Sequence, residues 1–238
     1  MTPDEVEAII TQPYSTWPIK VLGFVPNERT LPAPEKVLPS LFHYARQGVS
    51  FIHQNYARTD IARNKAALTL LGTDFDFLLM LDNDHKHDPD MLQKLCGWVM
   101  LYPEIRVIGG LNFQRRAPYK PAFFNEDEEG HVSVPLTFPD ELFTVDVLGT
   151  GSILIHRSVF TQIDANCAWF RYEYDGAPND YWPGEDIYFS HLCKKNGIPM
   201  YVDPSCRSPH ISEEETTEET FKSWYALHGV EDEQGKIQ

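Results

Sequence analysis

The sequence has little cysteine and no apolar run as long as a membrane span. Its four cysteines, Cys96, Cys167, Cys193 and Cys206, show no Cys-x-x-Cys spacing, so neither a zinc site nor a disulfide framework is indicated. The N-terminus lacks the basic-then-apolar pattern of a secretion signal, and no apolar segment approaches the length that crosses a bilayer. We therefore expect a reduced, cytoplasmic protein without a membrane span.

Basic residues are also scarce, because 20 Lys and Arg stand against 35 Asp and Glu, giving a formal net charge of −15. A broad nucleic-acid-binding face needs clustered Lys and Arg, so the composition argues against one but leaves room for local basic pockets. Much of the acid lies in two stretches, 126–129 and 213–219, and we expect these to be solvated loops or a tail.

The chain is long enough to bury a sizeable core, either as one large α/β domain or as two small ones. We expect an N-terminal arm (1–18), one domain (19–211) and an acidic C-terminal tail (212–238). Its hydrophobic content of 42% and its charged content of 23% are ordinary for a soluble globular protein.

Strand and helix patterns alternate over the first hundred residues, which favours a parallel sheet covered by helices. After Gly110 the pattern changes to a long, proline-containing excursion or β-hairpin over 113–143. The predicted strands are 21–25 (stopped by Pro26), 49–53, 75–81, 105–111, 145–148, 152–155 and 198–202, and the predicted helices are 36–47, one from Thr59 with Ala57, Ile61, Leu68 and Leu71 on its apolar stripe, 89–102, and 185 to Gly197.

The strongest signal is the apolar run that starts at Phe75 and breaks into Asp82-Asn83-Asp84. Such a run is typical of a strand buried on both faces of a parallel sheet. Ligands bind beyond the carboxyl ends of such strands, and carboxylate oxygens suit a hard divalent cation. The alternative is an acidic loop that only caps the next helix, but Asp88 before Pro89 is already placed for that role.

The order of the motifs resembles a GT-A fold glycosyltransferase, close to the family 2 nucleotide-sugar enzymes, over roughly residues 19–211. This resemblance implies a single α/β domain with a mostly parallel central sheet, helices on both faces, and a small mixed β-region in the C-terminal half. The motifs that carry it are Arg58 and Arg63-Asn64 on a helix, the strand into Asp82-x-Asp84, Gly149-Thr150-Gly151 before a strand, Trp182-Pro183-Gly184-Glu185-Asp186 at a helix start, and a late His210.

The resemblance implies transfer of a sugar from a nucleotide-diphosphate sugar to a hydroxyl acceptor with the help of Mn²⁺ or Mg²⁺, which stabilises the departing diphosphate. It places Asp84, Asp82 and His210 at the metal, with Asp82 near the ribose or a metal-bound water. His85 and His87 are rival metal ligands. For His210 the alternative is an ordinary surface or core histidine.

The same resemblance assigns the donor and acceptor sides. In an inverting transfer Asp186 is the general base and Glu185 positions the acceptor, although acids at a helix start also simply complement its dipole. The acceptor lies near Gly151 and Trp182, in an aromatic segment (166–184) that suits a saccharide and of which half is core. The donor contacts are Pro26, Arg58, Arg63, Asn64, Asp82 and Asn83, with ordinary surface charge as the alternative for the arginines.

A cluster of Arg115, Arg116 and Lys120 is one of the few basic patches of the chain, and we expect it to meet a phosphate of the donor or acceptor, so that a modified nucleotide remains compatible as acceptor. Two other classes compete. A nucleotidyltransferase would have the same sheet, but the loop 26–32 has no glycine. A non-catalytic calcium module fails because Lys86 and His87 stand where an EF-hand has an oxygen ligand and glycine.

Overall fold

In a computed structural model, the described residues are 1–27, 34–55, 57–127, 129, 132–135, 137–173, 184–211 and 215–228. They are built on a seven-stranded sheet with the strand order β2-β1-β3-β9-β4-β10-β7. Its strands are β1 (Val21–Asn27), β2 (Ser50–Asn55), β3 (Phe77–Leu81), β4 (Val107–Leu111), β7 (Phe143–Val145), β9 (Ser152–His156) and β10 (Met200–Arg207).

Five of these strands run in one direction, because β1 is parallel to β2 and β3, β10 is parallel to β4, and both β3 and β4 are antiparallel to β9. The edge strand β7 is antiparallel to β10. The mostly parallel sheet predicted from the sequence is therefore confirmed. The insertion of β9 between β3 and β4 was not predicted, because β9 follows β4 in the sequence and has no local signal for its direction.

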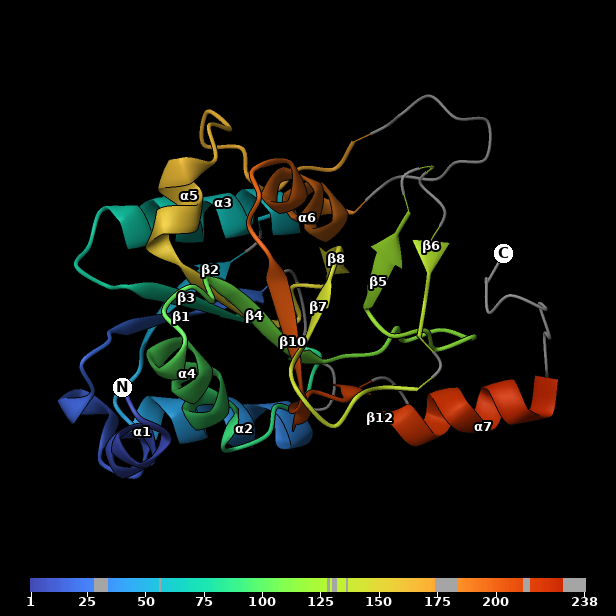
Figure 1. Ribbon diagram of the computed structural model, residues 1–238, viewed down its shortest axis with the longest axis horizontal. Coiled ribbons are helices and arrows are strands. Elements are labelled where there is room, and N and C mark those ends of the chain that lie inside the picture. Colours follow the sequence, from blue (N-terminus) through green and yellow to red (C-terminus); the bar gives the residue numbers. More distant parts are fainter. Residues whose placement is uncertain are drawn as a thin grey trace.

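Helices cover both faces of the sheet (Figure 1), as predicted. On one face lie α3 (Thr59–Leu71), α5 (Arg157–Gln162) and α6 (Glu185–Lys195), and on the other lie α1 (Pro3–Ile10), α2 (Pro34–Arg46) and α4 (Met91–Leu101). All five residues of β3 are buried between these layers, which explains its unbroken apolar run. Within the described residues, no helix has the length and apolar character needed to cross a membrane.

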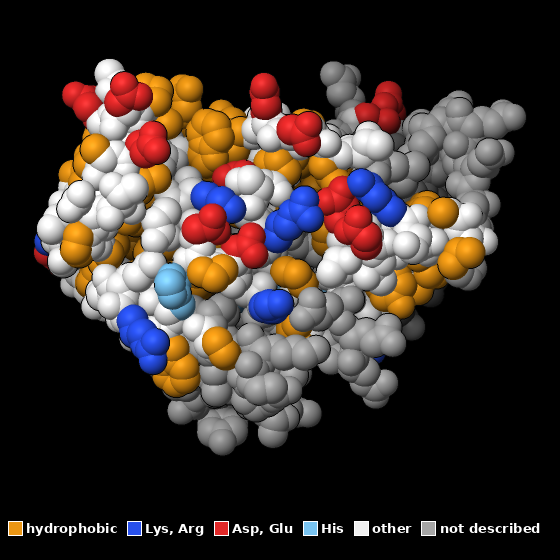
Figure 2. Space-filling view, turned by 90° about the horizontal axis from the view of Figure 1, so that it is seen from below, with side chains coloured by type: hydrophobic (Ala, Val, Ile, Leu, Met, Phe, Trp, Pro, Cys, Tyr) orange, Lys and Arg blue, Asp and Glu red, His pale blue; other side chains and the backbone are white. Residues whose placement is uncertain are grey.

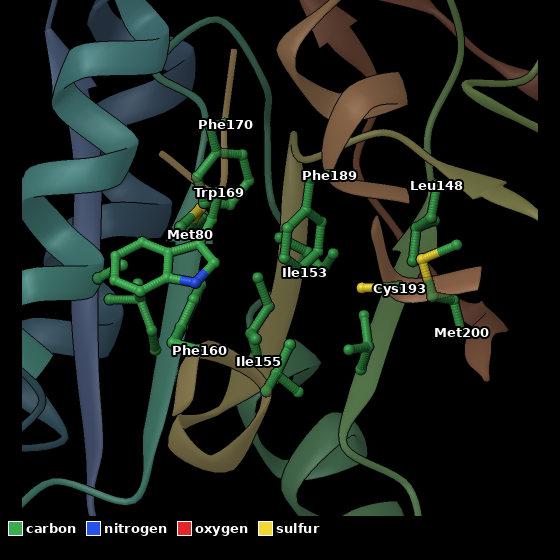
Figure 3. Close-up of a cluster of buried hydrophobic side chains, with 14 of the residues drawn as sticks. Met80, Leu148, Ile153, Ile155, Phe160, Trp169, Phe170, Phe189, Cys193 and Met200 are labelled. Atoms are coloured by element: carbon green, nitrogen blue, oxygen red, sulfur yellow. The ribbon is translucent and has the colours of Figure 1, made fainter. Parts of the chain in front are cut away.

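The core on the α3 side gathers side chains from distant parts of the chain (Figure 3). Phe170 stacks on Phe189 of α6 with 4.7 Å between the ring centroids, and Trp169 meets Phe160 of α5 edge to face at 5.3 Å. Trp169 and Phe170 are 3% and 1% exposed, so this part of the predicted aromatic segment is core. Tyr172 is partly exposed, and the aromatic residues at 174, 181 and 182 lie outside the described residues.

A smaller β-region and a C-terminal helix complete the fold. Three short strands between residues 123 and 148 pair antiparallel with one another, within and just beyond the stretch 113–143 predicted as an excursion or β-hairpin. In the stretch predicted as an acidic tail, Phe221 of the last helix is 1% exposed and packs into the core. The elements are β5 (Phe123–Glu126), β6 (Val132–Ser133), β8 (Val147–Leu148), β11 (His210–Ile211), β12 (Glu215–Thr216), α7 (Glu218–His228) and a 3₁₀ turn (Tyr14–Thr16).

Two local predictions were wrong. Pro26 does not stop the first strand but lies inside β1, at a point where only β2 pairs with it and the missing N–H is tolerated. Asp88 does not cap α4, which begins at Met91; its carboxylate instead accepts a hydrogen bond from the Arg207 N–H at 3.0 Å. Residues 3–10, within the predicted N-terminal arm, form α1, with a capping box between Thr2 and Glu5.

The apolar stripe predicted for α3 is only partly correct, because Ala57 and Leu71 pack against the core whereas Ile61 and Leu68 are each 45% exposed. The side that packs on the sheet has small alanines, which allow close approach, and a buried arginine, which is paired with carboxylates. These buried residues are Asp60, Ala62, Arg63, Ala66, Ala67 and Leu70.

Acidic and basic side chains are interspersed on the face seen from below in Figure 2, with no continuous basic patch on that face. Ion pairs join several of the charged residues of α4, β10 and α7. Lys94 pairs with Asp90, and Glu218 pairs with both Arg207 and Lys222.

Candidate metal and transfer site

The ends of three strands and the start of a fourth meet at one edge of the sheet. Asp82 follows β3, and its N–H donates to the Gly151 carbonyl at 2.9 Å, because the antiparallel β9 begins beside the end of β3. The segment after Asp82 then pairs with the segment after β10: Lys86 N–H donates to Pro209 at 3.0 Å, and Ile211 N–H donates to Asp84 at 2.7 Å. This pairing places His210 beside Asp84.

Asp84, His85 and His210 form a cluster whose ligand atoms all lie within 4.8 Å of one another. The Asp84 carboxylate lies 3.0 Å from Nδ1 of His85 through one oxygen and 2.9 Å from Nε2 of His210 through the other. The two imidazole rings are 4.2 Å apart between centroids. Burial alone would raise the pKa of Asp84, but these hydrogen bonds outweigh it and hold the pKa below its ordinary value.

The cluster fits a metal ion by its hydrogen bonding. Nδ1 of His210 lies 3.1 Å from the Phe113 carbonyl, which can only accept, so we assign the ring proton to Nδ1. The unprotonated Nε2 of His210 then faces Oδ2 of Asp84. Both atoms are acceptors, so a second proton or a cation must lie between them to make this contact favourable. Neighbouring ligands of a six-coordinate ion lie about 3 Å apart, close to the observed 2.9 Å. The Phe113 carbonyl is the type of outer partner that orients metal-binding histidines.

His87, the other rival ligand, has a structural position. It is 2% exposed, and its ring nitrogens contact the Ser208 hydroxyl and the Asp82 carbonyl, each at 3.0 Å. Burial lowers the pKa of His87 to about 3, so the ring is neutral and links the end of β3 to the segment after β10.

Asp82 lies outside the Asp84–His85–His210 cluster because its carboxylate pairs with Arg63. The Arg63 guanidinium, 2% exposed, donates to Asp82 at 2.8 Å and to Glu185 at 3.1 Å, and a third bond reaches the Thr150 carbonyl at 3.5 Å. Burial alone would lower the pKa of Arg63, but the two carboxylates outweigh it and raise the pKa. One buried cation thus joins β3, the turn before β9 and the start of α6.

Glu185 and Asp186 begin α6, as predicted. Burial raises the pKa of Asp186 to about 6, and the neighbouring Glu185 carboxylate adds to this shift. A carboxylate with a pKa near neutrality is suited to general-base chemistry. Burial also raises the pKa of Tyr172, and Glu185 contributes to that shift as a hydrogen-bond partner.

The other predicted donor residues have mixed surroundings. The side-chain amide of Asn64 donates to the Phe170 carbonyl at 2.7 Å and accepts from the Phe170 N–H at 3.0 Å. This side chain therefore fixes the segment that follows α5. Arg58 binds Asp60 through two hydrogen bonds of 2.7 and 2.6 Å and lies over the Tyr172 ring. Pro26 is buried in β1, and Asn83 is partly exposed between the two aspartates. Their donor contacts stay predictions.

Gly151, which was predicted to contact the acceptor, lies against His85. A Cβ atom at residue 151 would come within 2.9 Å of the His85 ring, so glycine is required for this close approach. The acceptor contact that the resemblance implies for Gly151 stays a prediction, whereas its contact with the His85 ring was not predicted. Trp182 lies outside the described residues.

No protein-family model and no curated protein sequence matches the chain. Among solved structures, A197 from STIV is similar, with 18% identity and a TM-score of 0.57 over 82% of this chain and 86% of A197. GalNAc-T7 with UDP, GalNAc and Mn²⁺ matches with 13% identity and a TM-score of 0.49 (88% of this chain, 48% of that one), and apo-UDP-glucose pyrophosphorylase with 7% and 0.46 (94% and 84%). At these identities the likeness to A197 shows the fold alone, and the two matches below 0.5 carry no argument.

Proposed function

We propose that this protein is a metal-dependent glycosyltransferase that moves a sugar from a nucleotide-diphosphate sugar to a hydroxyl acceptor with inversion. The observation that carries the proposal is the Asp84–His85–His210 cluster at the carboxyl end of β3. This is the edge of an α/β sheet at which ligands bind. The resemblance of the motif order to family 2 GT-A enzymes supports the same reading.

Asp84, His85 and His210 would hold the divalent cation. Two imidazoles with one carboxylate suit Mn²⁺ better than Mg²⁺, which prefers oxygen ligands. A cation bound there supplies Lewis-acid stabilisation of the departing diphosphate. Asp82, which Arg63 orients, lies beside this cluster and would contact the donor ribose or a metal-bound water.

Asp186 would take the proton from the acceptor hydroxyl. Its raised pKa leaves it ionised above about pH 6, and as a carboxylate it can accept the proton while the hydroxyl attacks the anomeric carbon. Glu185 is held by Arg63, which is also bonded to Asp82. The proposed base therefore lies at the start of a helix that Arg63 links to Asp82 on the proposed donor side. Gly151 and Trp182 would line the acceptor side.

The proposal is tested with a panel of nucleotide sugars in a thermal-shift assay, with Mn²⁺, with Mg²⁺ and with a chelator. A cognate donor should raise Tm by mass action only when the cation is present. Asp84→Asn should abolish this response while the protein remains folded. Asp90→Asn, an exposed acid that pairs with Lys94, is the matched control and should respond as the wild type does.

Donor hydrolysis or transfer that persists in chelator would contradict the proposal. Release of diphosphate from a nucleoside triphosphate, with a sugar phosphate as the second substrate, would instead assign the protein to the nucleotidyltransferases. A metal-dependent Tm shift with saccharides but without turnover of any donor would leave a binding module.

A further inference from the structure

The loop that follows β4 is a closed hairpin over residues 112–122. Ala122 N–H donates to Asn112 at 2.9 Å, Gln114 N–H donates to Lys120 at 2.7 Å, and Tyr119 N–H donates to Arg116 at 2.8 Å. Phe113 at the base is buried and packs near Phe221 of α7, with 5.8 Å between ring centroids. The hairpin is therefore anchored in the core and held by its own backbone.

Two contacts join this hairpin to the proposed metal cluster. The Phe113 carbonyl lies 3.1 Å from Nδ1 of His210, and Nη2 of Arg115 lies 3.3 Å from Oδ2 of Asp84. Oδ2 is the same oxygen that contacts Nε2 of His210. The hairpin therefore orients one proposed ligand and places a guanidinium beside another.

The charge on the hairpin exceeds what the surrounding described residues neutralise. Burial lowers the pKa of the Lys120 ammonium, and no carboxylate of the described residues offsets this effect. Asp84, the partner of Arg115, already contacts ring nitrogens of His85 and His210, at 3.0 and 2.9 Å. A carboxylate that also binds a divalent cation has little charge left for a guanidinium. Arg115 is half exposed, so its remaining donors can bind an anion.

We propose that the 112–122 hairpin is a phosphate-binding arm in which Arg115 contacts the diphosphate of the donor and holds it after bond cleavage. This rests on the proposed function. A guanidinium presents paired donors that match phosphate oxygens, and a diphosphate bound at Asp84 through the cation lies within reach of Arg115. Lys120 adds a second positive charge to the same hairpin. Arg115 thereby binds the leaving group beside the metal.

The test uses full-length protein and calorimetric titration, first with Mn²⁺ alone and then with the preformed Mn²⁺–inorganic diphosphate complex. Arg115→Gln should bind the complex roughly 10- to 100-fold more weakly than the wild type, as expected for loss of a charge-assisted contact. Its affinity for Mn²⁺ alone should be retained. Arg115→Lys keeps the charge but lacks the paired donors, so its affinity for the complex should lie between those of the wild type and Arg115→Gln. Arg46→Gln, the same charge change at an exposed position at the end of α2, should bind as the wild type does.

If the wild type binds Mn²⁺ but Arg115→Gln binds the complex as tightly as the wild type and Arg46→Gln do, the hairpin proposal is wrong and the metal site stands. If the wild type binds neither Mn²⁺ nor the complex, the proposed function fails and the hairpin proposal with it. Circular dichroism and Tm for each variant separate a local loss of binding from misfolding.

Discussion

The carboxylate of Asp84 and the imidazole of His210 lie 2.9 Å apart although 126 positions separate them in the sequence. The contact exists because the backbone after β3 pairs with the backbone after β10, through the bonds from Lys86 to Pro209 and from Ile211 to Asp84. A backbone pairing therefore fixes the distance between two side chains that the proposed chemistry needs together.

The role of Asp186 as general base predicts a large change in turnover with little change in donor binding. Asp186→Asn removes the proton acceptor but preserves the shape of the side chain, so turnover should fall by about 10²–10⁴-fold. Single-turnover kinetics and donor titration separate the two effects. A product that keeps the anomeric configuration of the donor would show that the base assignment is wrong.

The burial of Asp186 predicts that the same substitution stabilises the fold at neutral pH. The pKa of Asp186 is about 6 in the folded protein against 3.8 ordinarily, so the folded state binds the proton more tightly than the unfolded state. The contribution of Asp186 to wild-type stability should therefore fall as the pH rises from 4 to 6. Asp186→Asn should be more stable above pH 6, by at most about 3 kcal/mol, and the gain should vanish near pH 4.

Urea unfolding at pH 4, 6 and 8 measures this effect. Asp164→Asn, at an exposed position, is the matched control and should change stability by less than about 0.5 kcal/mol at each pH. A gain for Asp186→Asn that does not depend on pH would mean that proton binding is not its cause.

The close approach of Gly151 to His85 predicts a specific effect of one methyl group. In Gly151→Ala the new Cβ would come within 2.9 Å of the His85 ring, so the ring must move, and Mn²⁺ affinity should fall by about tenfold or more. Electron paramagnetic resonance of free Mn²⁺ gives this affinity. Gly72→Ala, the control, adds a methyl group where the contacts are ordinary, and its Mn²⁺ affinity should equal that of the wild type. If Gly151→Ala binds Mn²⁺ as tightly as Gly72→Ala does, His85 is not a ligand.

The bonds of Arg63 predict a large loss of stability when its charge is removed. Arg63→Met leaves Asp82 and Glu185 without their buried counter-charge, and about 3 kcal/mol should be lost. Adding Glu185→Gln removes one of the unpaired charges and should restore part of the loss, which urea unfolding measures as coupling between the two sites. Arg171→Met, the control at an exposed position, should leave the free energy of unfolding nearly unchanged. If the effects of Arg63→Met and Glu185→Gln on stability are additive, Arg63 and Glu185 do not interact.

The features that could be predicted from the sequence are those with a local signal. The run into Asp82-x-Asp84 is a buried strand because apolar residues on both faces need helices on both faces. Glu185-Asp186 begins a helix, and Gly197 follows its end with a positive φ of 64°. The start of α1 was also readable from Thr2-Pro3 and Glu5, a capping-box pattern next to a proline.

The remaining features depend on partners that are distant in the sequence. Arg63 is buried because Asp82 and Glu185 neutralise it, so its burial could not follow from the pattern of α3 alone. His85 joins Asp84 and His210 only after two chain segments pair. The contact of Arg115 with Asp84 likewise needs the hairpin to fold back over the crevice edge.

The place of β9 in the sheet also sets an order in which the molecule can assemble. The two neighbours of β4 are β9 and β10, and both follow it in the chain. A chain growing from its N-terminus can pair β1, β2 and β3 early, but β4 must wait for at least residue 152 before it has any partner in the sheet. Loop closure over such separations is slow. His210 arrives later still, so the cluster that we propose to bind the cation forms only when nearly the whole sheet has folded, and a released fragment that lacks β10 would have no such cluster to bind metal.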